Sequence, residues 1–186
     1  MNIAILASGA GSNAANIIQH FKNTPVTISL IACNKAEAGV FQIAKEHHID
    51  AILLTKENFK SSNVFVQELQ QRNIELVILA GFLWLVPQNL VSAFENRIIN
   101  IHPALLPKFG GKGMYGHFVH EAVCAAHEAE SGITVHLVNE EFDKGRILFQ
   151  ASCNVENCNA SEIEAKVRAL EIAHFPKVIE NFISEM

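Results

Sequence analysis

The segment that decides the fold is "NIAILASGAGSNAANIIQHF", residues 2–21. It begins with a nearly continuous apolar run, which predicts a buried β-strand, and residues 12–21 have the apolar spacing of a helix. Between these two elements Gly9, Gly11 and Ala14 form a G-x-G-x-x-A pattern. A glycine loop in this position lets backbone N–H groups approach a phosphate, so the segment predicts an α/β fold with an anion site.

Strands and helices continue to alternate along the chain. Predicted strands cover residues 26–33, 50–55, 75–80 and 97–103, and predicted helices cover residues 37–47, 63–72 and 87–94. These strands are continuously hydrophobic, which is typical of a parallel sheet covered by helices on both faces. We therefore expect an α/β fold with a doubly wound, mostly parallel, Rossmann-like sheet.

The pattern changes after residue 103. A glycine-rich stretch, residues 108–116, precedes a predicted helix at 117–128. Two strand-like runs joined by a polar turn then lie within residues 132–155. Because a short turn joins them, these runs predict an antiparallel C-terminal extension of the sheet.

The last predicted helix runs from Ser161 to about residue 181. Ser161 and Glu164 have the spacing of a capping box at its start. Its apolar residues Ile172, Phe175, Val178, Ile179 and Phe182 are expected to face the core.

Composition limits the classes of function. The 186 residues fit one domain, 49% of them are apolar, and the formal net charge is −5. With no run of Lys or Arg, the sequence favours neither nucleic acid nor an anionic membrane as a partner. No apolar run approaches the ~18 residues needed to span a bilayer, and no signal peptide is recognisable. Four irregularly spaced cysteines are typical of reduced thiols, so we expect a cytoplasmic protein.

The glycine loop has three interpretations. We favour a single phosphate group, bound by backbone N–H groups with Ser8, Ser12 and Asn13 as side-chain donors. A dinucleotide site would need an acidic residue at the end of the second strand, where the sequence has "CNK", residues 33–35. A tight turn without a ligand is the third interpretation.

The strand at 97–103 ends with two polar residues, Asn100 and His102. Because they are two residues apart, their side chains point to the same side of the strand. An amide and an imidazole together could stabilise an oxygen that becomes negative during acyl transfer. The turn at 138–145 contains Glu140, Glu141 and Asp143, and a carboxylate of this turn close to His102 could raise the pKa of the imidazole by favouring the imidazolium. A hydrogen-bonded structural histidine is the alternative.

Four motifs in the right order carry a family resemblance. They are "ASGAGSN" at 7–13, "LAGF" at 79–82, "NIHPALLPKF" at 100–109 and "GITVHLVNEEFDKG" at 132–145. Together they resemble the phosphoribosylglycinamide formyltransferases, folate-dependent enzymes of purine biosynthesis. The resemblance covers nearly the whole chain. It implies transfer of the formyl group of 10-formyltetrahydrofolate, the co-substrate, to the amino group of glycinamide ribonucleotide, without a metal.

The resemblance also implies roles for individual residues. Asn100, His102 and Asp143 would be catalytic, with His136 supporting them. The ribonucleotide would contact Gly11, Ser12, Asn13 and Glu171, and the folate would contact Leu83, Trp84, Leu85, Val86 and Asn100. The chain would be one formyltransferase domain, 1–186, with a phosphate-binding half at 1–100 and a folate-binding and catalytic half at 101–186.

The sequence departs from the family pattern at the expected folate tail. Trp84 stands where a basic residue is common, and the match around Ser62 lacks an arginine often found near the folate tail. Lys56 and Lys60 are the candidates for holding the tail carboxylates. The glycine-rich stretch at 108–116 is also longer than the common loop.

Several alternatives stay open at this point. A formyltetrahydrofolate hydrolase-like deformylase shares the Asn–His–Asp set, but we expect it to carry an N-terminal regulatory domain. A methionyl-tRNA formyltransferase would need a C-terminal RNA-binding domain. A non-catalytic nucleotide- or folate-binding module is the alternative from a different class. The partners we expect are the two small-molecule substrates, and a homodimer is left open.

A possible metal site deserves separate mention. His117, His120, Glu121, Cys124 and His127 fall at helical spacings of three and four. Because they lack the H-E-x-x-H pattern of zinc proteases, we favour a polar helix face over a metal site.

Overall fold

The computed structural model describes residues 1–60 and 62–186 as two compact units, Met1–Ile99 and Asn100–Met186. The first unit contains β1 (Asn2–Ala7), α1 (Ser12–Phe21), β2 (Thr27–Cys33), α2 (Val40–Glu46), β3 (Ala51–Leu53), α3 (Lys56–Lys60), α4 (Val64–Gln71), β4 (Ile74–Leu79) and α5 (Gln88–Ala93). Strand β5 (Ile98–His102) begins in the first unit and ends in the second. The second unit continues with α6 (His117–Ala125), β6 (Glu130–Leu137), β7 (Ile147–Asn154) and α7 (Ala160–Ser184).

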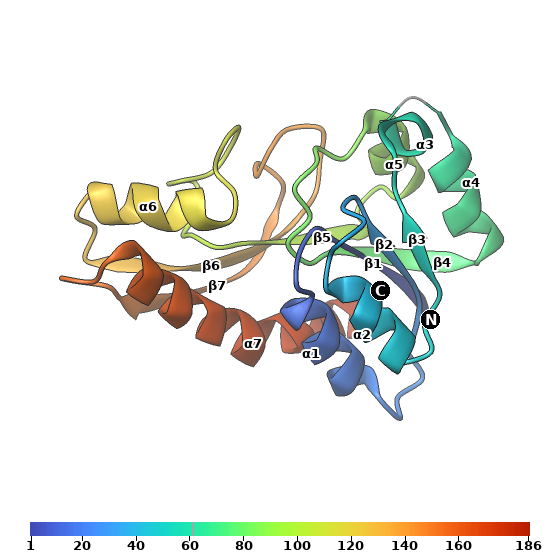
Figure 1. The fold of residues 1–186 in the computed structure, drawn as a ribbon, viewed down its shortest axis with the longest axis horizontal. Coiled ribbons are helices and arrows are strands. Elements are labelled where there is room, and N and C mark those ends of the chain that lie inside the picture. Colours follow the sequence, from blue (N-terminus) through green and yellow to red (C-terminus); the bar gives the residue numbers. More distant parts are fainter. Residues whose placement is uncertain (61) are drawn as a thin grey trace. The chain divides into compact units, whose positions relative to one another are not determined.

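The first unit has a parallel sheet with the strand order β3-β2-β1-β4. The order reverses after β1, because the chain adds β2 and β3 on one side and β4 on the other. Right-handed crossovers in opposite directions place helices on opposite faces, which makes the sheet doubly wound. Helix α1 packs with α2, and α4 packs with α5 (Figure 1). The expected fold class is confirmed here.

The strands form because their residues fill a core on both faces. In β1 every residue from Ile3 to Ala7 is fully buried, and Leu76, Val77 and Ile78 of β4 are as well. A strand with two buried faces has no polar face, so it appears in the sequence as a continuous apolar run. The short helix α3 is not predicted by the sequence, because five residues are too few to show a helical period.

The second unit is built around an antiparallel pair. Residues Glu130 to His136 of β6 pair with Asn154 to Ile147 of β7, as the two strand-like runs predict. Helix α7 packs on β6 and β7 and also contacts α6 (Figure 1). The antiparallel C-terminal extension is therefore confirmed. None of the helices in residues 1–60 and 62–186 is long and apolar enough to cross a membrane.

The start of α7 corrects one sequence prediction. Its capping box is formed by Asn159 and Glu162, not by Ser161 and Glu164. The Asn159 side chain accepts the Glu162 N–H at 3.0 Å, and the Glu162 carboxylate accepts the Asn159 N–H at 2.8 Å. Both residue pairs have the same spacing, and the helix begins at the earlier one because Asn is as good an N-cap as Ser.

Candidate active site

The end of β5 presents Asn100 and His102 on the same side of the strand. His102 is 3% exposed and Asn100 is half-buried. The intervening Ile101 points to the other side, where it is buried in the core. Pro103 ends the strand, because proline cannot donate a hydrogen bond to a neighbouring strand. The apolar run thus anchors the two polar side chains rigidly.

The His102 ring is held at both nitrogens. Its Nε2 lies 2.7 Å from the carbonyl oxygen of Phe109, and its Nδ1 lies 3.7 Å from Oδ2 of Asp143. A carbonyl only accepts hydrogen bonds, so the neutral ring carries its proton on Nε2. The Nδ1 lone pair then faces the carboxylate. A second proton on Nδ1 would complete an ion pair with Asp143.

Asp143 reaches this position through an unusual backbone. Its φ is 55°, in the left-handed region that Asp tolerates better than most residues. Its Oδ2 accepts the N–H of Gly111 at 2.9 Å, and its Oδ1 lies 3.6 Å from Nε2 of His136. The turn also requires Gly145, because a Cβ there would lie 1.7 Å from the Leu137 carbonyl oxygen. This close approach explains the glycine two residues after the aspartate.

His136 connects β6 to Asn100. Its Nδ1 lies 2.8 Å from the Leu137 carbonyl oxygen, and its Nε2 lies 3.0 Å from the Asn100 amide nitrogen. The carbonyl fixes the proton on Nδ1, so Nε2 accepts a hydrogen bond from the amide. This contact orients Asn100. An amide nitrogen has two hydrogens, so Asn100 can donate to a second acceptor as well.

Electrostatics set the charge states of these groups. Burial lowers the pKa of His102 below its ordinary value of 6.5, although Asp143 and the Phe109 carbonyl act in the opposite direction. Asp143 thus raises the pKa of His102, as predicted, but the effect of burial is larger and the net shift is downward. Burial raises the pKa of Asp143, but His136, His102 and the Gly111 N–H outweigh it, and the pKa is lowered. The set combines a neutral imidazole with an ionised carboxylate at neutral pH.

The glycine loop lies in the first unit. Gly11 is the N-cap of α1 with a φ of 83°, and its carbonyl accepts the Ala15 N–H at 2.9 Å. Ser12 and Asn13 occupy the first turn of α1, whose N–H groups point out of the start of the helix. The first turn contains no acidic residue. These backbone groups and the positive end of the helix dipole suit an anion.

The predicted folate segment, residues 83–86, follows β4. Ser8 is 3% exposed, and its hydroxyl accepts the Leu83 N–H at 2.9 Å. The Ser8 N–H also donates to the Gly81 carbonyl at 3.1 Å. Ser8 therefore joins the glycine loop to the predicted folate segment. Within that segment Val86 is buried, whereas Leu85 is 38% exposed.

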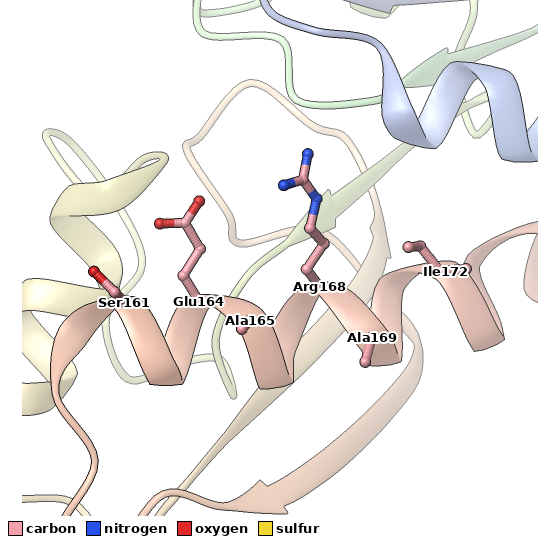
Figure 2. Close-up of a pocket in the computed structure, with 6 residues that line it drawn as sticks. All are labelled: Ser161, Glu164, Ala165, Arg168, Ala169 and Ile172. Atoms are coloured by element: carbon pink, nitrogen blue, oxygen red, sulfur yellow. The ribbon is translucent and has the colours of Figure 1, made fainter.

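Glu171 lies on α7 in the second unit, half-buried, one turn after Arg168. A pocket of about 380 Å³ on this helix is lined by Ser161, Glu164, Ala165, Arg168, Ala169 and Ile172 (Figure 2). Glu164 and Arg168 point to the same side of the helix in Figure 2.

The prediction that Ile172 faces the core is wrong, because its side chain is 47% exposed. Phe175, Val178 and Ile179 are buried as expected.

The two histidines of α6 differ, because only His117 of the pair lies beside carboxylates in the described structure. His117 lies 3.3 Å from Oε1 of Glu121 and 3.1 Å from Oε2 of Glu164 on α7. His120 is 4% exposed, and its Nδ1 has no hydrogen-bond partner among the residues that the structure describes. Within residues 1–60 and 62–186, no group of three or more His, Cys, Asp or Glu side chains could hold a metal ion.

Two groups of the site are not predicted from the sequence. They are the Phe109 carbonyl, which fixes the His102 proton, and the Gly111 N–H, which binds Asp143. Both belong to the backbone of the glycine-rich stretch 108–116. No side chain marks them, so only the number of glycines there indicates an unusual backbone.

The fold is that of a doubly wound α/β protein, and at the end of β5 the structure brings the buried His102 close to Asp143. The chain belongs to the formyl transferase family, whose model matches residues 1–179.

Relatives and solved structures agree with this assignment. The chain is 38% identical to the chloroplastic phosphoribosylglycinamide formyltransferase of Vigna unguiculata over 98% of this chain and 61% of that protein. It is 33% identical to the phosphoribosylglycinamide formyltransferase of Bacillus subtilis, over 97% and 93% of the two chains. The crystal structure of the Bacillus halodurans phosphoribosylglycinamide formyltransferase superposes with a TM-score of 0.90 at 33% identity, covering 99% and 96%. The chain thus spans about three fifths of the plant relative's length.

Proposed function

We propose that the protein transfers the formyl group of 10-formyltetrahydrofolate to the amino group of glycinamide ribonucleotide. The observation that carries this proposal is the contact set of Asn100, His102, Asp143 and His136, with distances of 3.0, 3.6 and 3.7 Å. The relatives with the same family membership are named for this reaction. No covalent enzyme intermediate and no metal are part of the proposal.

In the proposed reaction, the amine nitrogen of the ribonucleotide attacks the formyl carbon, and the carbonyl oxygen becomes negative. The Asn100 amide donates to this oxygen while His136 holds the amide in place. Hydrogen-bond donors aimed at a developing oxyanion are worth roughly 10²–10³ in rate. The intermediate then collapses, and the bond between the formyl carbon and the folate N10 breaks.

One proton must move from the attacking amine to the folate N10. Asp143, ionised in the free protein, relays this proton to His102, whose lowered pKa leaves it neutral at the start. His102 then acts as a general acid toward the leaving nitrogen. The developing negative charge of the intermediate favours the imidazolium that burial otherwise disfavours. The cycle returns both groups to their original charge.

The remaining roles follow from the family resemblance. Gly11, Ser12 and Asn13 bind the ribonucleotide phosphate through the start of α1, and Glu171 contacts the glycinamide part. Residues Leu83, Trp84, Leu85 and Val86 bind the pterin, partly through backbone groups, and Asn100 contacts the folate. The cytoplasm is the proposed location, although the name of the Vigna unguiculata relative includes the word chloroplastic. A homodimer is a further proposal that a sedimentation measurement would test.

The decisive experiment incubates the protein with 10-formyltetrahydrofolate, with and without glycinamide ribonucleotide. We expect loss of the formyl group only when the amine is present, with one formylated ribonucleotide formed per folate consumed. Equal deformylation in water alone would favour a hydrolase-like deformylase. Binding of either ligand without any turnover would favour the non-catalytic module.

A further inference from the structure

An ion pair lies one residue away from the carbonyl that fixes the His102 proton. The ammonium group of Lys108 lies 2.8 and 3.1 Å from the two carboxylate oxygens of Glu128, which stands between α6 and β6. The next residue, Phe109, places its carbonyl oxygen 2.7 Å from Nε2 of His102. The carboxylate is partly shielded from water, since only 27% of the Glu128 side chain is exposed. The two contacts are thus neighbours along the chain, and only the second has a part in the mechanism proposed above.

The backbone at Phe109 does not adopt its conformation by local preference. Its φ is 55°, in the left-handed region, which is unfavourable for a residue that has a Cβ. The next residue is Gly110, where a Cβ would lie 2.5 Å from a methyl carbon of Leu106. A backbone in this region persists only where the surrounding structure holds it. The position of the Phe109 carbonyl therefore depends on the contacts that its neighbours make.

A hollow lies beside this part of the backbone. Its volume is about 200 Å³, and its lining includes Leu105, Lys108, Phe109 and Glu128. Close packing fixes most of a protein interior, and an unfilled space offers no van der Waals contact on its side. The Lys108–Glu128 ion pair joins two segments that line the hollow. It can therefore hold the Phe109 backbone where packing does not.

We propose that the Lys108–Glu128 ion pair positions the Phe109 carbonyl against His102, so that Lys108 and Glu128 are positioning residues of the formyl-transfer site. The proposal rests on the proposed function and adds two residues that act through the backbone of Phe109. A carbonyl at Nε2 selects the neutral tautomer with its proton on Nε2, and the Nδ1 lone pair then faces Asp143. A displaced carbonyl would let the proton occupy Nδ1. In that tautomer Nδ1 could not accept a proton from Asp143.

The tautomer of His102 can be measured without any substrate. In protein with isotope-labelled histidine nitrogens, the NMR shifts of the two ring nitrogens at neutral pH distinguish Nε2–H from Nδ1–H, and His102→Gln identifies the signals. The variants are Lys108→Gln, Glu128→Gln and the charge-swapped double variant Lys108→Glu/Glu128→Lys. Lys166→Gln is the matched control, because Lys166 is an exposed lysine of the same unit that bonds a different carbonyl, that of Asn154, at 2.8 Å. Thermal unfolding would show that all variants are folded.

We expect the wild type to hold the Nε2–H tautomer of His102. Both single variants should move the two nitrogen signals toward each other, as a mixture of tautomers requires. The charge-swapped variant should restore the wild-type signals, and Lys166→Gln should keep them. Because an ion pair near the surface shifts an equilibrium by up to about fivefold, kcat of the single variants should fall about three- to fivefold, with KM changed less than about twofold.

The pH dependence of kcat separates positioning from general damage. Burial lowers the pKa of His102, whereas Asp143 and the Phe109 carbonyl raise it. Loss of the carbonyl contact would lower this pKa further, so kcat of the single variants should begin to fall at a lower pH than that of the wild type. A general loss of stability would make kcat fall at a higher pH instead.

The failure of this proposal and the failure of the proposed function are distinguishable. If both single variants keep the wild-type nitrogen signals, the ion pair does not position the Phe109 carbonyl, and the proposed function is untouched. If the single variants change the signals and the charge-swapped variant does not restore them, Lys108 and Glu128 do not act as a pair. If the signals respond as expected but the wild type transfers no formyl group, the proposed function fails while the positioning of the His102 ring stands.

Discussion

The glycine loop of the first unit and the Asn100–His102–Asp143 set of the second unit differ in the chemical groups that they present. The loop presents backbone N–H groups at the start of α1, and its Gly9 and Ala10 are exposed. The second set presents side chains, of which His102 is 3% exposed. Backbone groups can bind a charge but cannot move a proton. A buried imidazole and carboxylate can do so, and each depends on its neighbours for its charge state.

Both regions nevertheless depend on one residue in the left-handed region. Gly11 has a φ of 83° and Asp143 has a φ of 55°. At Gly11 the absence of a side chain is what matters, because a Cβ would lie 2.8 Å from both Val40 and Ile43. At Asp143 the side chain is what matters, and it forms the contacts with Gly111, His102 and His136. In the proposed function, the same backbone conformation would thus support binding in one case and proton transfer in the other.

The largest effect should come from removing the charge of Asp143. Asn tolerates the left-handed region as Asp does, so Asp143→Asn changes the charge and keeps the backbone. We expect kcat to fall at least ~10²-fold, because His102 loses its ionic partner and the proton relay. Steady-state kinetics with both substrates would measure it. Glu141→Gln is the control, because the Glu141 carboxylate is exposed in the same turn and pairs with Lys144, so this variant should keep the wild-type kcat. Full activity of Asp143→Asn would remove Asp143 from the mechanism.

The side chains of the site could be predicted from the sequence, but their charge states could not. Asn100, His102 and Asp143 stand in recognisable motifs, and β5 brings the first two to one side. The direction of the His102 pKa shift depends on how deeply the ring is buried, which no residue spacing reveals. The contacts of Phe109 and Gly111 are likewise hidden, because any residue type has a carbonyl and nearly any has an N–H.

A smaller effect is expected in the loop. Gly11→Ala places a methyl group against Val40 and Ile43 and forces alanine to a positive φ, which costs roughly 1–2 kcal/mol. We expect KM for glycinamide ribonucleotide to rise about tenfold, the equivalent of roughly 1.4 kcal/mol, with a much smaller change in kcat.

The same loop provides a matched control. A Cβ on Gly9 would meet nothing within 4 Å, so Gly9→Ala should fold and bind the ribonucleotide like the wild type. Comparing KM for the ribonucleotide with KM for the folate in both variants would separate a local effect from general damage. Equal KM values for Gly11→Ala and Gly9→Ala would show that the loop conformation does not matter for binding.

The fold itself could be predicted largely because its core is so regular. Each predicted strand of the first unit overlaps an observed one, since a strand buried on both faces leaves a continuous apolar run. The errors lie where local signals compete, as at α7, where Asn159–Glu162 and Ser161–Glu164 offer equal spacings. The prediction that Ile172 faces the core is another error. In a helix of 25 residues some apolar side chains lie on the face away from the core, and Ile172 is one of them.

The smallest predicted effect is the change of folding stability with pH that arises from the buried imidazoles of His120 and His102. Burial lowers the pKa of His120 below 6.5, and His117 and His102 act in the same direction, while Glu164 opposes them. The pKa of His102 is lowered as well. As the pH falls, both rings take up a proton in the unfolded chain before they do so in the folded protein. The stability that the two neutral rings provide is therefore complete above about pH 6.5 and is lost as the pH falls below it. The loss is at most about 1.4 kcal/mol per group for each pH unit.

Urea unfolding at pH 7.5 and pH 5.5 would measure this loss. We expect the wild type to be less stable at pH 5.5, and we expect His120→Gln to reduce the difference between the two pH values by up to about 1 kcal/mol. His47→Gln removes an exposed imidazole at the end of α2 and should keep the wild-type difference. If the stability of His120→Gln differs between the two pH values as much as that of the wild type, the protonated His120 ring must find a hydrogen-bond partner in the folded wild type. The buried Nδ1 without a hydrogen bond argues against that outcome, because a proton placed there would meet no acceptor in the described structure.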